Sequence, residues 1–147
     1  MTEITSEAVK QAIISELLQI FPNTTVYKEA RTNPLFPHFF VYQIDVSCQR
    51  ERRYYNLLTY SMDVRYRIAS DPSTNLRLQQ DLDSVGFQLL HNFNHLAYRD
   101  TFIRCSEKSI EKQEGVLHFF FKVVILEKEI NSNESIKQNR LGVKIDT

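Results

Sequence analysis

The chain has 147 residues, 42% of them hydrophobic, and its 18 basic side chains balance 18 acidic ones. This length and apolar content suffice for one domain with its own core. The zero formal charge excludes a molecule-wide attraction to nucleic acid or to anionic membranes. No apolar run approaches the roughly 18 residues of a membrane span and no signal-like start is present, so we expect a cytoplasmic protein. The 3 glycines are too few for nucleotide-binding loops, whose backbones must approach phosphates closely.

The N-terminal part of the chain predicts a helix, a short strand and a loop. In residues 6–21, apolar side chains recur every three or four positions, which is the spacing of one helix face. Thr5 or Ser6 is available to cap the start of this helix. The β-branched and aromatic residues at 24–28 predict a strand, and the prolines within 31–37 predict a loop that is open to a neighbouring molecule.

A long two-stranded hairpin is predicted next. Residues 39–46 and 58–68 alternate apolar and polar side chains, which indicates strands with one dry face and one wet face. The polar segment 47–55 between them is too long for a tight turn. We therefore expect an extended hairpin whose tip projects from the sheet.

A second helix and three strands are predicted for the rest of the domain. Apolar residues between positions 78 and 93 follow helical spacing, with Ser73 or Thr74 as cap, and this helix should pack on the dry sheet face. Strand-like runs follow at residues 95–100, 101–112 and 115–127. Turn signals separate these runs, so the last two should form a hairpin. The final run is apolar on both faces over its middle, which predicts a strand that is central in its sheet or covered by another subunit.

Together these elements predict an α+β fold, with a mostly antiparallel sheet and two helices packed on one face. We expect one domain over residues 1–130 and a polar C-terminal arm over residues 131–147. The arm should be disordered in the isolated chain or should order on a partner. In the second case its apolar residues add as a strand to a neighbour's edge, namely Leu141, Val143 and Ile145.

No catalytic or metal-binding constellation is expected. His91 and His95 stand four apart, as two ligands on a helix face would, but no cysteine or acidic cluster supplies a third ligand. Cys48 and Cys105 lack CxxC spacing and read as reduced strand residues. Asp63 falls on the wet face of a strand, where a carboxylate ordinarily serves solubility. We therefore expect no cofactor, no metal and no enzymatic activity.

The one local concentration of charge is the predicted hairpin tip. It carries Arg50, Arg52 and Arg53 beside Tyr54 and Tyr55, and such a combination can bind phosphates or the acidic rim of a protein. A solvated tip whose charges discourage edge-to-edge aggregation is the alternative. These residues do not indicate whether the tip contacts DNA or protein.

Three segments follow a family pattern in the same order. The first is AVKQAIISELLQIFPNTTVYKE, an amphipathic helix that ends in Phe-Pro and leads to a Tyr strand. The second is PHFFVYQIDVSCQRERRYYNLLTYSMDVRY, and the third is the turn and strand EGVLHFFFKVVI. Over about residues 6–128 the chain thereby resembles the phage tail terminator family of contractile-tailed phages and defective prophages of Gram-positive bacteria. It departs from the family at Glu114, where aspartate is more usual, and in the longer polar tail after Ile130.

The resemblance implies a tail-terminator-like fold and a structural role in the virion tail. Such subunits assemble as a ring, commonly a hexamer, on the last ring of the tail tube at its neck-proximal end. The ring ends tube polymerisation, joins the neck and head completion proteins, meets the sheath in contractile tails, and surrounds a lumen through which DNA passes. A cyclic ring needs two different faces on each subunit. The loop residues Pro34, Leu35 and Phe36 and the C-terminal arm are candidate contacts between subunits.

Two other functions stay open at this stage. The chain could be a different neck or head-tail connector subunit, since these share small α+β folds and ring geometry. It could also be a small nucleic-acid-binding module that uses the hairpin tip. The balanced net charge argues against the second reading, because an excess of Lys and Arg is the usual footprint of such modules.

Overall fold

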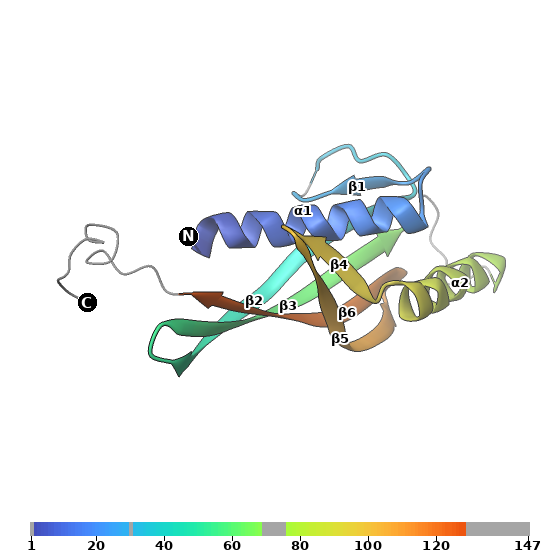
Figure 1. The fold of residues 1–147 in the computed structure, drawn as a ribbon. Helices are drawn as coiled ribbons and strands as arrows, with labels where there is room; N and C mark the ends of the chain where they lie inside the picture. The colour runs from blue at the N-terminus through green and yellow to red at the C-terminus, as the bar shows by residue number, and fades with distance from the viewer. Residues whose placement is uncertain (1, 30, 69–75, 129–147) are drawn as a thin grey trace.

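The computed structural model describes residues 2–29, 31–68 and 76–128. Its elements in chain order are α1 (Thr2–Ile20), β1 (Thr25–Tyr27), β2 (His38–Arg52), β3 (Tyr55–Arg67), α2 (Leu76–Asn92), β4 (His95–Tyr98), β5 (Thr101–Gln113) and β6 (Val116–Lys128). The strands form one sheet in the order β1-β2-β3-β6-β5-β4, with β1 parallel to β2 and the other neighbours antiparallel (Figure 1). The prediction of an α+β fold with a mostly antiparallel sheet is confirmed.

Helix α1 runs across one face of the sheet (Figure 1). Its buried residues follow the predicted helical spacing, and Val9, Ile13 and Leu17 are each at most 1% exposed. The helix ends at Ile20, shortly before Pro22, whose ring cannot continue a helix. It begins at Thr2 rather than at residue 6, so the predicted caps Thr5 and Ser6 are instead inside the helix.

The β2–β3 hairpin is longer than the two alternating runs in the sequence. Its register extends from His38↔Arg67 to Arg52↔Tyr55, so the polar segment after residue 46 is paired strand and only two residues turn the chain. The prediction of an extended hairpin is confirmed, and its strands continue through the polar segment because backbone pairing requires no apolar side chains. Figure 1 shows the end of the hairpin reaching beyond the helices.

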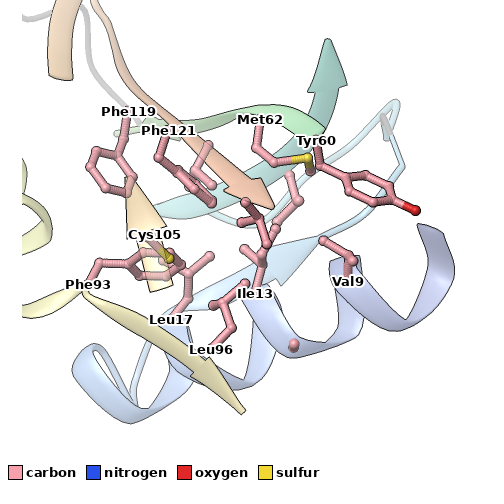
Figure 2. Packing of buried hydrophobic residues seen from close by; sticks show 14 of the residues in the cluster. Val9, Ile13, Leu17, Tyr60, Met62, Phe93, Leu96, Cys105, Phe119 and Phe121 are labelled. Atoms are coloured by element: carbon pink, nitrogen blue, oxygen red, sulfur yellow. The ribbon is translucent and has the colours of Figure 1, made fainter. Parts of the chain in front are cut away.

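Both helices pack on the same sheet face and contribute to one core. Figure 2 shows α1 against this core, which is rich in aromatic rings. Phe93, just after α2, lies with its ring centroid 5.4 Å from Phe119 and 5.0 Å from Phe121 of β6. α2 approaches the sheet at Gly86, where an added Cβ would lie 2.8 Å from Ile110 Cδ1. The prediction that the second helix packs on the dry face is confirmed.

Strand β6 is central in the sheet, which is one of the two alternatives that the sequence predicts. It pairs with β3 from Tyr66↔Leu117 to Tyr55↔Lys128. On its other side it forms the predicted hairpin with β5, from Gln113↔Val116 to Cys105↔Val123. β5 is irregular between Ser106 and Ser109, and its first four residues pair with β4. A bulge of this kind bends a strand, so β5 turns away from β6 toward β4.

The aromatic core predicts a large cost for truncating Phe93. Phe93→Ala should lower the free energy of unfolding by about 3–5 kcal/mol, because Phe93 is fully buried between two other rings. The matched control is Phe102→Ala, whose side chain is 74% exposed and should change stability by at most about 0.5 kcal/mol. Urea unfolding measures both, and equal losses would contradict this packing.

Candidate assembly surfaces

The hairpin tip brings two of the three predicted arginines together. Arg50 Nη1–H donates to the backbone carbonyl of Arg53 at 2.9 Å, and the Arg53 guanidinium lies 5.5 Å from the ring centroid of Tyr54. Arg50 and Arg53 are exposed, whereas Tyr54 and Tyr55 are half-buried. The side chain of Arg52 lies outside the described part of the structure. The tip therefore presents cationic groups beside aromatic rings, a combination suited to anionic surfaces.

At the other end of the sheet, the loop before β2 presents apolar side chains to solvent. Leu35 is 66% and Phe36 41% exposed, while Pro34 is half-buried. The Leu35 backbone is fixed on both sides, because its N–H donates to Tyr27 Oη at 3.0 Å and its carbonyl accepts from His38 Nδ1–H at 2.9 Å. Exposed apolar side chains on a fixed backbone are typical of a preorganised contact surface.

A hollow of about 700 Å³ lies between this loop and the adjoining strand ends. Arg31, Arg65 and Arg67 line it, together with the two acids Glu29 and Glu114. The Arg31 guanidinium lies 5.0 Å from the ring centroid of Tyr27. No local sequence pattern indicates this hollow, because its lining comes from segments that are far apart in the chain.

The sheet face opposite the helices holds a buried ionic cluster around Asp63. The Asp63 side chain is 4% exposed, and its Oδ2 lies 2.8 Å from Arg65 Nε and 3.0 Å from His118 Nδ1. Arg65 in turn lies 4.7 Å from the ring centroid of Tyr42, and Phe120 stacks on His118. The expectation that Asp63 is a solvated surface carboxylate was wrong. Alternation along one strand cannot reveal that His118, 55 residues away, covers this carboxylate.

The remaining predicted site residues lie apart from these surfaces. His91 and His95 flank the end of α2, and the described residues contain no group of three or more potential ligands for a metal ion. Cys48 is exposed on β2, and Cys105 is buried, where burial raises the pKa of its thiol to about 12. Leu141, Val143 and Ile145 lie outside the described residues. Their segment follows β6, whose last residue Lys128 pairs with Tyr55 beside the hairpin tip.

Burial of His38 predicts a pH dependence of stability. Burial lowers the pKa of His38 below its ordinary 6.5, against the opposing effect of its hydrogen bond to Leu35. The unfolded chain then binds this proton more readily, so stability should fall as the pH drops through about 6.5. In His38→Gln this contribution should disappear.

The measurement is the urea midpoint at pH 8 and at pH 5.5, with His91→Gln, at an exposed histidine, as the control. The drop on acidification should be smaller in His38→Gln than in the wild type, and unchanged in the control. An equal drop in all three proteins would contradict the assignment to His38.

Comparison with known proteins shows which family the chain belongs to. The family model described as phage tail terminator protein matches residues 8–135, which is most of the chain. No curated protein matches the chain. Among the described helices, none is both long and apolar enough to cross a membrane.

Proposed function

Because the chain belongs to the phage tail terminator family, we propose that it is one subunit of a hexameric ring that caps the tail tube. The ring sits at the neck-proximal end, stops tube polymerisation and joins the neck and head completion proteins. In a contractile tail it also meets the sheath, and DNA passes through its lumen. The family match over residues 8–135 carries this proposal, since it spans every strand of the described sheet.

The shape of the subunit supports assembly into a ring. A cyclic ring requires two different contact faces on each subunit. The exposed loop with Leu35 and Phe36 precedes the start of β2, and the cationic tip follows its end. β2 has 15 residues, which at roughly 3.3 Å per residue separates the two surfaces by about 45 Å. One subunit can therefore contact different partners at its two ends.

The tip's composition supports an anionic partner. Arg50 and Arg53 are exposed at the end of a paired ladder, which holds the backbone of the tip in place before they bind. An acidic rim on the tube, an acidic sheath surface and the DNA in the lumen all offer the required charge. Binding of the tip to any of these partners would weaken with added salt, because exposed charges are screened within about 10 Å at 0.1 M ionic strength.

Charge reversal at the tip tests its part in capping. The double variant Arg50→Glu, Arg53→Glu should bind the ends of purified tail tubes at least roughly tenfold more weakly at low salt than the wild type. The control is Arg77→Glu, Arg104→Glu, which makes the same charge change at exposed positions on α2 and β5. Electron microscopy of labelled protein on tubes counts the occupied ends.

Wild-type binding by the tip variant would show that the tip does not face the tube or sheath. A chain that binds neck proteins and never binds tube ends would instead be a connector subunit. A gel shift that the tip variant abolishes would identify DNA as the partner of the tip.

A further inference from the structure

Strand β6 loses one of its two partners halfway along its length. Its pairing with β5 ends at Cys105↔Val123, and β5 before that point pairs with β4, from His95↔Arg104 to Tyr98↔Thr101. Residues 124–128 continue to pair with β3 on the other side. Within the described residues, this five-residue stretch of β6 therefore has an open edge.

The backbone of this stretch directs hydrogen-bonding groups to the open edge. The Cys105 N–H donates to the carbonyl of Asn94 at 2.8 Å, on the side away from β6. Its partner Val123 therefore directs its own groups toward β3, because successive residues of an antiparallel strand face opposite neighbours. Beyond Val124, the alternation then places the backbone groups of every second residue at the open edge, namely those of Leu126 and Lys128. Such an edge is a template for another strand.

A hollow of about 490 Å³ lies where β5 and β6 diverge. All five β6 residues of the open edge line it, with Ile103 of β5 and Tyr98 of β4 on the other side. Val124 and Leu126 are 41% and 55% exposed, so apolar side chains border the edge. The Tyr98 hydroxyl is buried and has no hydrogen-bond partner among the described residues. The hollow thus offers free backbone groups and apolar side chains to an added strand.

We propose that residues 141–145 of a second copy of the chain add as a strand to this edge and fill the hollow. The segment reads LGVKI, and its five residues equal the length of the open edge. Its apolar side chains, Leu141, Val143 and Ile145, share one face of a strand and lie beside those of Val124 and Leu126. The inference rests on the proposed ring, because the arm and the hollow supply its two different subunit faces.

The length of the intervening chain favours a second copy over the arm's own subunit. Residues 129–140 separate β6 from the added strand. A hairpin in which the arm folds back on β6 of its own chain would usually need only about 2–5 connecting residues. Twelve extended residues span about 40 Å, and a domain of this size has a radius of gyration of about 14 Å. The connection therefore reaches the hollow of an adjacent subunit.

Cross-linking between differently tagged full-length chains tests the pairing. In either strand direction, equal lengths place Val143 opposite Leu126 at the centre of the edge. One chain carries Leu126→Cys and the other Val143→Cys, both with Cys48→Ser to remove the exposed native thiol. A short thiol-specific cross-linker is applied to the mixed chains, alone and with tail tubes. The matched control replaces Leu126→Cys by Ile44→Cys, since Ile44 is 47% exposed on β2.

The product that joins the two tags should form at least tenfold more with Leu126→Cys than with Ile44→Cys. Equal yields from both positions, or no product either alone or on tubes, would overturn the inference. A further variant carries Leu126→Cys and Val143→Cys in the same chain. A cross-link formed only within that chain would place the arm on its own subunit and would also overturn the inference. If the chain caps tubes but the cross-linked product of Leu126→Cys with Val143→Cys does not form, only the proposed strand addition is refuted. If that product forms but the chain does not cap tubes, only the proposed function is refuted.

Discussion

The structure depends on the antiparallel pairing of β3 with β2 on one side and β6 on the other. The β3–β6 ladder is continuous from Tyr66↔Leu117 to Tyr55↔Lys128, and β2 follows the opposite edge of β3 over nearly the same length. One face of this three-stranded ladder receives both helices, and the other holds the Asp63 ion pairs. The same register fixes where the surfaces lie: the cationic tip at one end, the exposed loop at the other, and the open edge of β6 near the tip.

The elements that the sequence predicted correctly are those with a local period. α1 and α2 bury residues at three- and four-residue spacing, and β3 alternates at period two, so each pattern is complete within one segment. The two apolar faces of β6 predicted a strand that is central or covered by another subunit, and the sheet order shows the central position. The resemblance to the phage tail terminator family, carried by three ordered segments, agrees with the family match over residues 8–135.

What the sequence could not reveal depends on pairing between distant segments. The strands extend through the polar residues before Arg53 because the ladder is held by backbone hydrogen bonds, which carry no hydropathy signal. Asp63 is buried by His118 from another strand. The divergence of β5 from β6 depends on a bulge near Glu107, whose φ of 52° is unusual for a residue other than glycine. The open edge and its hollow follow from that bulge, so periodicity alone does not predict them.

Three surfaces of this phage tail terminator family member are suited to contacts with other molecules. The cationic tip suits an anionic partner, the loop with Leu35 and Phe36 suits an apolar one, and the open edge of β6 suits an extended strand. None of these surfaces needs the reactive geometry of an enzyme, and their separation along the sheet suits a subunit with several neighbours. The central claim is that this subunit ends tube growth.

The most direct test assembles tail tubes from purified tube protein with and without the chain and measures their lengths by electron microscopy. The account predicts tubes that stop growing when the chain is added, each with a ring of the protein on one end. A chain that stays monomeric, binds no tube ends and leaves the length distribution unchanged would contradict it.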